Sequence, residues 1–138
     1  MKEQIQNRTK KMALEIIKLS DYLPNKSVGW TFSNQIIRSA TSVAANYRAV
    51  CRAKSDKDFI SKMETVIEEA DETLFWLEMI EESEVIADLG LQIDDSKNQQ
   101  SQINHLKSEV NELISIFVVS VKTVKNRLNQ KPSILNQK

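Results

Sequence analysis

Few residues in this chain could carry out catalysis. The sequence holds one histidine, His105, and one cysteine, Cys51. A di-iron site in a helical bundle needs two Glu-x-x-His pairs on facing helices, and a serine hydrolase would have to use the same histidine. The chain has only two glycines, and neither belongs to a glycine-rich turn that could hold a phosphate or a nucleophile. We therefore predict a protein that is not an enzyme and that holds no metal or cofactor.

Two weaker chemical possibilities have simpler explanations. His105, Glu109 and Glu112 could bind a metal from one side of a helix, but a His–Glu pair four residues apart on a helix surface is the ordinary arrangement. The four acids within 68–72 are also candidate metal ligands. Their side chains point in different directions on a helix, so they cannot all reach one ion. Cys51 lies between two arginines, yet it projects from an apolar helix face, where a cysteine behaves as a small hydrophobic residue.

Positive charge on the second predicted helix indicates a binding surface. Arg38, Arg48 and Arg52 lie on the flank and back of its apolar face, and Lys54 follows them. These four residues are candidates for contacts with the phosphates of RNA or DNA. The alternative is that they pair with the acidic helix that comes next, in the same subunit or in a neighbour.

Charge is unevenly distributed along the chain, although the formal net charge is zero. Residues 1–57 hold 11 Lys and Arg against 4 Asp and Glu, residues 58–95 hold 1 against 13, and residues 96–138 hold 7 against 2. An acidic segment between two basic segments predicts electrostatic pairing within the protein or between subunits. This pattern differs from the uniformly basic composition of a typical nucleic-acid-binding protein.

Three large apolar residues of the third predicted helix indicate a second contact surface. Phe75, Trp76 and Met79 point away from the stripe that this helix presents to the core. Aromatic and methionine side chains are enriched in the centres of subunit interfaces. The three residues are therefore candidates for the interface of a homo-oligomer; alternatively, they pack against the connector at 85–91 of the same chain.

These residues must be positioned by helices. With only two glycines and two prolines in 138 residues, the chain has too few turn residues for an all-β fold. Apolar residues recur every three or four positions in four segments, at about 2–22, 31–54, 55–82 and 97–128. Four amphipathic helices with short connections predict an all-α, antiparallel up-down-up-down four-helix bundle.

The sequence also predicts where the first helices begin and end. Pro24 and Gly29 end the first helix and lie in the loop after it. Thr31 or Ser33 caps the second helix, and Ser55 caps the third, since serine and threonine side chains accept hydrogen bonds from free N–H groups at helix starts.

Domain organisation and compartment follow from the same patterns. Pro132 is expected to stop the last helix, so one bundle domain covers 1–129 and a flexible tail covers 130–138. The start of the chain lacks the apolar block of a signal peptide. The most apolar run, 113–121, is much shorter than the roughly 20 residues of a membrane span. We predict a soluble, cytoplasmic protein.

A family resemblance is carried by the second and third predicted helices. The matching residues are 35–40 (QIIRSA), 42–43 (SV), 46 (N), 52 (R), 55 (S), 58–59 (DF), 69–73 (EADET) and 76–78 (WLE). The pattern resembles the small bacterial four-helix-bundle proteins known as 23S rRNA intervening-sequence proteins, and the helix layout agrees over about residues 5–128. This family is similar in fold to the accessory protein of diversity-generating retroelements.

The resemblance implies a function as well as a fold. Members of both groups form ring-like homopentamers, and the accessory protein engages nucleic acid and a reverse transcriptase through a basic surface. The resemblance therefore implies a non-catalytic homo-oligomeric scaffold or adaptor, associated with nucleic acid or with an enzyme such as a reverse transcriptase. Direct binding of RNA or DNA is the alternative. The chain departs from the family pattern after Asn46, where many members have Ile-x-Glu-Gly and this chain has YRAV.

Overall fold

Four helices make up the fold of this chain. The computed structural model describes residues 1–86 and 93–136, without the side chains of 93–98 and 131–136. The helices are α1 (Lys2–Ser20), α2 (Ser27–Val50), α3 (Asp56–Glu82) and α4 (Ile93–Asn136). No strand occurs in the described ranges. The predicted all-α four-helix bundle is confirmed.

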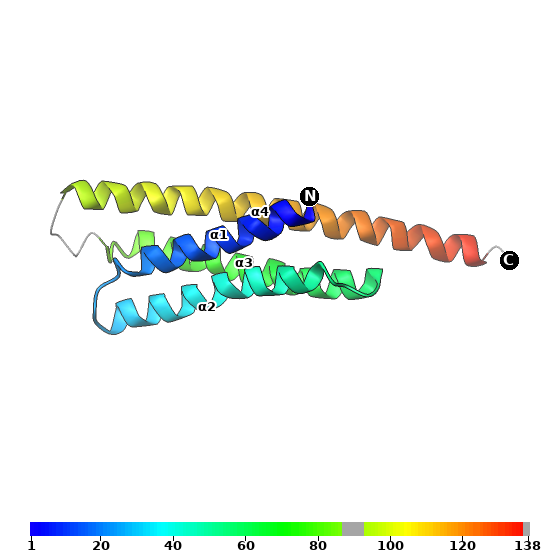
Figure 1. The fold of residues 1–138 in the computed structure, drawn as a ribbon, viewed down its shortest axis with the longest axis horizontal. Coiled ribbons are helices and arrows are strands. Elements are labelled where there is room, and N and C mark those ends of the chain that lie inside the picture. The colour runs from blue at the N-terminus through cyan, green and yellow to red at the C-terminus, as the bar shows by residue number, and fades with distance from the viewer. Residues whose placement is uncertain (87–92, 137–138) are drawn as a thin grey trace.

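The four helices pack in the order in which they occur in the chain. Each helix lies antiparallel to the next, and α4 also packs against α1, which closes the bundle (Figure 1). Consequently α1 and α3 run in the same direction and lie diagonally across the core. The C-terminal part of α4 projects beyond the ends of the other three helices (Figure 1).

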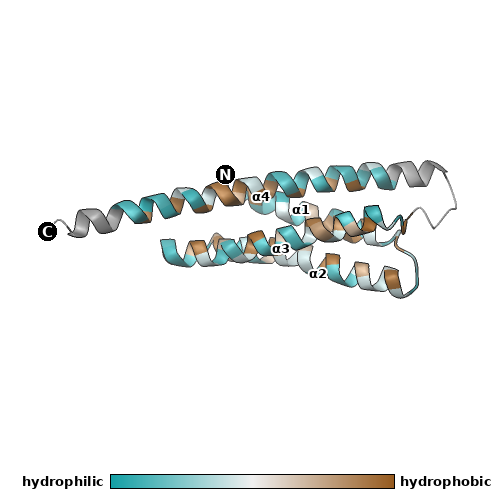
Figure 2. Cartoon of the chain, turned by 180° about the vertical axis from the view of Figure 1, so that it is seen from behind, coloured by the Kyte–Doolittle hydropathy of each residue, from teal (hydrophilic) through white to brown (hydrophobic). Residues whose placement is uncertain are grey.

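Burial of one face of each helix drives this arrangement. Figure 2 shows hydrophobic and hydrophilic residues alternating along each helix with helical spacing. Met12, Ile36, Val66 and Leu106 represent the four helices in the core and are at most 1% exposed. Within the core, the rings of Tyr47 on α2 and Phe117 on α4 stack with their centroids 5.6 Å apart.

The predicted start of the third helix is confirmed in atomic detail. The side chain of Ser55 accepts a hydrogen bond from the N–H of Asp58 at 3.0 Å. The Asp58 carboxylate in turn accepts hydrogen bonds from the backbone N–H of Lys54 at 3.0 Å and from the Lys62 ammonium at 2.5 Å. These contacts, with Lys62 the largest, lower the pKa of Asp58. The reciprocal cap thus reaches one residue further back than in the usual capping box.

The predicted start of the second helix is wrong. Helix α2 begins at Ser27 rather than at Thr31 or Ser33, so Gly29 lies inside its first turn instead of in the loop. A Cβ atom at Gly29 would stand only 1.7 Å from the carbonyl oxygen of Pro24. Glycine is therefore needed here for the close approach of two backbone segments, a role that helical periodicity does not reveal.

The last helix also differs from expectation, and the connector before it is described only in part. Val85 and Ile86 are buried, as the sequence predicts for the connector, whereas its other two apolar residues, Leu89 and Leu91, lie outside the described residues. Helix α4 continues through Pro132 to Asn136, so the prediction that this proline stops the helix is wrong. Proline removes a single helical hydrogen bond, and the residues on both sides of it keep helical geometry. A flexible tail over 130–138 stays a prediction.

Over the residues that the structure describes, no helix combines the length and the apolar character that crossing a lipid bilayer requires.

Candidate interaction surfaces

The cations of α2 are divided between two sides of that helix. Arg38 faces α3, where its guanidinium pairs with Glu69 at 3.4 Å and, more closely, with Glu72. The hydrogen bond from Arg38 is the largest cause of the lowered pKa of Glu72, and the pKa of Arg38 is raised in return. For this arginine, the structure shows the alternative interpretation, in which it pairs with the acidic helix of its own subunit.

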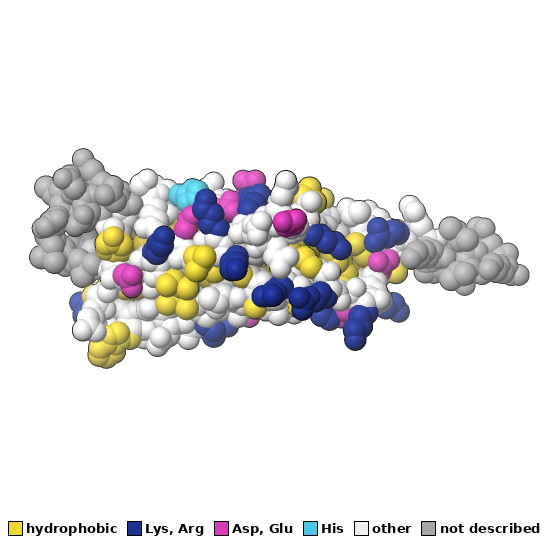
Figure 3. Space-filling view, viewed as in Figure 1, with side chains coloured by type: hydrophobic (Ala, Val, Ile, Leu, Met, Phe, Trp, Pro, Cys, Tyr) yellow, Lys and Arg dark blue, Asp and Glu magenta, His cyan; other side chains and the backbone are white. Residues whose placement is uncertain are grey.

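Arg48 lies on the other side of α2, beside α1. Together with Lys10 it lines a groove of about 370 Å³ between the two helices, which we call the basic groove. The other lining residues are Gln6, Asn7, Thr41, Ala44 and Ala45. None of these residues carries a carboxylate, so neither cation meets an acid within the groove. Figure 3 shows a run of Lys and Arg side chains across this part of the surface.

Arg52 and Lys54 extend the positive surface at the C-terminal end of α2. Both side chains are exposed. Lys54 lines a second, smaller groove together with Lys2 and Arg127, and Asp56 at its edge pairs with Arg127 at 3.2 Å. Three of the four cations predicted to contact phosphates thus share one end of the bundle, whereas Arg38 does not join them.

The large apolar residues of α3 are likewise divided. Phe75 and Met79 are 48% and 37% exposed, and we call this pair the α3 patch. Trp76 turns inward: its ring centroid lies 5.8 Å from that of Phe32 on α2 and 4.9 Å from that of Phe75, which it meets edge-on. Trp76 therefore contributes to the packing of its own subunit, and its ring contacts the ring of Phe75.

The polar atom of Trp76 has an unusual environment. Its indole nitrogen is buried and has no hydrogen-bond partner of good geometry among the described residues. The indole N–H nevertheless contributes to the lowered pKa of Glu72, after the larger effect of Arg38. This N–H is therefore close enough to influence the Glu72 carboxylate without forming a full hydrogen bond to it.

A metal site on α4 is not supported by the side-chain contacts. Arg8 of α1 holds Glu109 through two hydrogen bonds of 2.7 and 3.0 Å and also pairs with Glu112 at 3.2 Å. His105 instead faces Glu15 at 3.5 Å. The hydrogen bond from Arg8 lowers the pKa of Glu109. In the part of the chain with described side chains, no three His, Cys, Asp or Glu residues are grouped as metal ligands would be.

Cys51 sits beside the core, as the sequence suggests. It is partly buried and packs against the core cluster. Burial, with a smaller contribution from Cys51, raises the pKa of Tyr47 to about 12. The cysteine therefore belongs to the packing around Tyr47.

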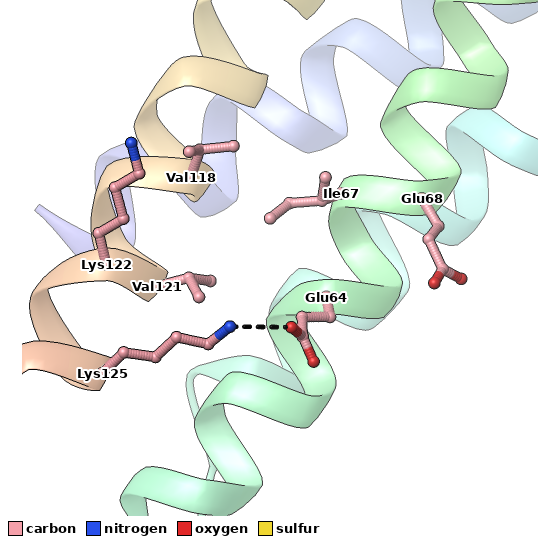
Figure 4. Close-up of a pocket in the computed structure, with 7 residues that line it drawn as sticks. All are labelled: Glu64, Ile67, Glu68, Val118, Val121, Lys122 and Lys125. Carbon is pink, nitrogen blue, oxygen red and sulfur yellow. Dashed lines mark hydrogen bonds and ion pairs between the residues drawn. The ribbon is translucent and has the colours of Figure 1, made fainter. Parts of the chain in front are cut away.

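A further groove lies between α3 and α4 (Figure 4). Its walls are Ile67, Val118 and Val121, and Lys125 reaches across to Glu64 at 3.4 Å. The remaining lining residues are Glu68 and Lys122. The lining contains no histidine, cysteine or hydroxyl group.

One exposed apolar surface was missed from the sequence. Leu14 and Ile17 on α1 are 52% and 38% exposed, and we call this pair the α1 patch. A hydrophobic area is visible among Lys and Arg side chains in the left half of Figure 3, where α1 lies. Plotting Leu14 on the helical wheel would have revealed it, because it falls opposite the stripe of Met12, Ile16 and Leu19.

The fold and its surfaces define an all-α bundle protein with two exposed apolar patches and a separate basic groove. The chain belongs to the family of 23S rRNA-intervening sequence proteins, which matches residues 1–118. The predicted family membership is thereby confirmed.

A solved structure gives the same result at the level of the fold. A crystallised protein of unknown function from the S23 ribosomal protein family of Bacteroides thetaiotaomicron is 27% identical, with a TM-score of 0.68. The match covers 86% of this chain and 98% of that chain. A comparison with curated proteins finds no match.

Proposed function

We propose that this protein is a non-catalytic scaffold or adaptor that works as a homo-oligomer, a pentamer by analogy with the family. Its binding partner would be nucleic acid or an enzyme that acts on nucleic acid, such as a reverse transcriptase. The protein would work in the bacterial cytoplasm. The observation that carries the proposal is the exposure of Phe75 and Met79 side by side on α3.

Exposure of these two side chains is costly in an isolated subunit. Residues i and i+4 of a helix are neighbours, so Phe75 and Met79 form one continuous apolar surface. Burying a side chain of this size stabilises a complex by about 1.5–3 kcal/mol. Aromatic and methionine residues are also the types that interface centres favour. A subunit contact at the α3 patch accounts for both the exposure and the residue types.

The test of this proposal is the mass of the variant Phe75→Glu/Met79→Glu. Two carboxylates in a desolvated contact would be strongly unfavourable, so we expect the mass to fall to that of one chain, 15.8 kDa. Sedimentation velocity measures the mass, and circular dichroism checks that the helices persist.

The matched control is Val119→Glu, because Val119 on α4 is 61% exposed and lies outside the α3 patch. The control should keep the mass of the wild type. An oligomer of unchanged mass in the double variant would remove the α3 patch from the interface.

A second candidate function is direct binding of RNA or DNA. It is favoured by the basic groove, in which Lys10 and Arg48 face no carboxylate, and by the neighbouring Arg52 and Lys54. The family name refers to ribosomal RNA, which is consistent with such a ligand. Repetition of these cations around an oligomer would strengthen their combined field.

Salt dependence tests this second function. Each phosphate contact changes the slope of log K against log salt by about 0.9 for duplex DNA, so Arg48→Ala/Arg52→Ala should reduce the slope by about 2 and weaken binding. Arg38→Ala is the matched control, because Arg38 is paired with acids of α3. Binding to a DNA duplex that is equally strong and equally salt-dependent in the double variant would rule out these arginines.

A further inference from the structure

We propose that the groove lined by Lys2, Lys54 and Arg127 binds a nucleoside phosphate, supplied as a free mononucleotide or as the phosphorylated end of a nucleic-acid strand. We call this groove, which has a volume of about 320 Å³, the end groove. Both sources share the same chemistry, a phosphate monoester joined to a sugar and a base. The site does not depend on the proposed homo-oligomer, and the strand end would add one contact to the second candidate function.

Positive charge reaches the end groove from three separate parts of the chain. Lys2 lies at the start of α1, Lys54 in the turn between α2 and α3, and Arg127 on α4. The N-terminus and this turn lie in the same half of the bundle, and α4 runs past both (Figure 1). Like charges around one cavity repel one another, and an anion between them relieves this repulsion.

The acids of this region compensate the positive charge only in part. Asp56 is the one carboxylate among the described residues that line the groove, and it pairs with Arg127 at 3.2 Å. The Asp58 carboxylate lies outside the lining and is held by Lys62 and by the backbone N–H of Lys54.

The two lysines of the end groove are exposed and available to a ligand. Neither Lys2 nor Lys54 forms an ion pair with any other residue whose side chain is described. Three cations and one carboxylate give the described lining a net charge of +2. A phosphate monoester carries a charge of about −1.5 to −2 at pH 7, whereas a phosphodiester inside a strand carries one negative charge. The lining therefore matches a monoester more closely.

An apolar wall lies beside these charges. It consists of Val50, Ala53, Phe59 and Val124. Phe59 is half-buried, so part of its surface remains open to a ligand. Aromatic side chains bind nucleobases by stacking, with little preference for sequence. A sugar and a base can thus contact the wall while their phosphate meets the cations, whereas an inorganic anion would leave the wall unused.

Ser55 supplies a neutral hydrogen-bond donor to the same groove. Its Oγ accepts a hydrogen bond from the N–H of Asp58 at 3.0 Å, so the hydroxyl proton can still be donated to a phosphate oxygen. The volume of about 320 Å³ is near the lower end of the range for small-molecule sites, about 300–1,000 Å³. This size suits one nucleotide better than several.

Calorimetric titration of the full chain with AMP and with adenosine tests the site. AMP should bind at least about tenfold more tightly, since only AMP carries the phosphate. Lys2→Gln/Lys54→Gln should weaken AMP binding by about tenfold. The matched control is Lys18→Gln/Lys26→Gln, which removes two exposed lysines at the opposite end of the bundle and should bind AMP like the wild type.

A 5′-phosphorylated oligonucleotide and its 5′-hydroxyl counterpart distinguish the two sources of the phosphate. A strand end is the ligand if the phosphorylated strand binds about tenfold more tightly and the double lysine variant abolishes that difference. A free nucleotide is the ligand if only AMP binding depends on Lys2 and Lys54.

Two results would overturn the site: no preference for phosphate in either pair of ligands, or unchanged binding of AMP and of both strands in the double lysine variant. Salt-dependent binding of the 5′-hydroxyl strand that is lost in Arg48→Ala/Arg52→Ala would then still support the second candidate function. Conversely, AMP binding without binding of either strand would support the site while that function fails.

Discussion

Replacing Phe117 with alanine is expected to lower the free energy of unfolding by about 3–5 kcal/mol. Phe117 is completely buried on α4, and its ring stacks on Tyr47 of α2. Truncation would remove the largest fully buried side chain of the described residues and leave a cavity that the rigid helices cannot close. Urea unfolding at a fixed protein concentration measures the change, since the stability of an oligomer depends on concentration.

The neighbouring position Val119 provides the control for this prediction. It lies on the same helix but is 61% exposed, so Val119→Ala should change the stability by no more than about 0.5 kcal/mol. A loss below about 1 kcal/mol for Phe117→Ala would mean that this ring is not part of a tightly packed core.

Gly29→Ala is expected to destabilise the protein, although the same change in most helices is stabilising. Alanine is favoured over glycine in helix interiors by about 0.5–1 kcal/mol. Here the new Cβ would stand 1.7 Å from the Pro24 carbonyl oxygen and 2.8 Å from its carbon. Both are backbone atoms, so the first turn of α2 must move, and we expect a net loss of about 1–3 kcal/mol.

Thermal unfolding measures the effect of Gly29→Ala, with Thr31→Ala as its control. Thr31 is exposed in the same part of α2, and alanine there should leave the melting temperature unchanged or slightly raised. A stabilising effect of Gly29→Ala would show that Pro24 and the start of α2 are not in close contact.

The sequence was sufficient to predict the helices and their core faces. Periodic apolar residues place Met12, Ile36, Val66 and Leu106 in one core, because a helix can hide only the face on which such residues recur. The cap at Ser55 could also be predicted, since it depends on a side chain and a backbone group only three residues apart. Local chemistry and a regular period were enough for these features.

Contacts between helices could not be predicted in the same way. Arg38 and Arg48 lie on one broad side of α2 in a helical wheel, but α3 covers one edge of that side and α1 the other. Arg38 therefore pairs with Glu69 and Glu72, while Arg48 lines the basic groove together with Lys10. Which acid an arginine meets depends on helix order and register, and these are set by the whole bundle.

The exposure of the aromatic residues of α3 could not be predicted for the same reason, because it depends on contacts between helices. Phe75 and Trp76 are adjacent in sequence and both lie off the core stripe, yet only Phe75 is exposed. Helix α2 approaches closely enough for Phe32 to cover Trp76. Adjacent residues point in directions about 100° apart, so one neighbouring helix is enough to bury one of them and leave the other bare.

The two candidate functions use different parts of the surface, and Lys10 on α1 lies where these parts meet. Lys10 borders both the basic groove and the α1 patch, whereas Arg48, Arg52 and Lys54 lie away from the patch. Assembly through the patches would leave those three cations on the surface of every copy. A homo-oligomer would therefore present several equivalent basic surfaces, which suits an adaptor for a long polyanion.

The most direct test of the central claim, that apolar surface on α3 joins copies of this chain, is the mass of the unmodified protein in solution. Sedimentation equilibrium at tens of micromolar should give a whole-number multiple of 15.8 kDa greater than one, and the same multiple after moderate dilution. A mass of 15.8 kDa across that concentration range would contradict the claim.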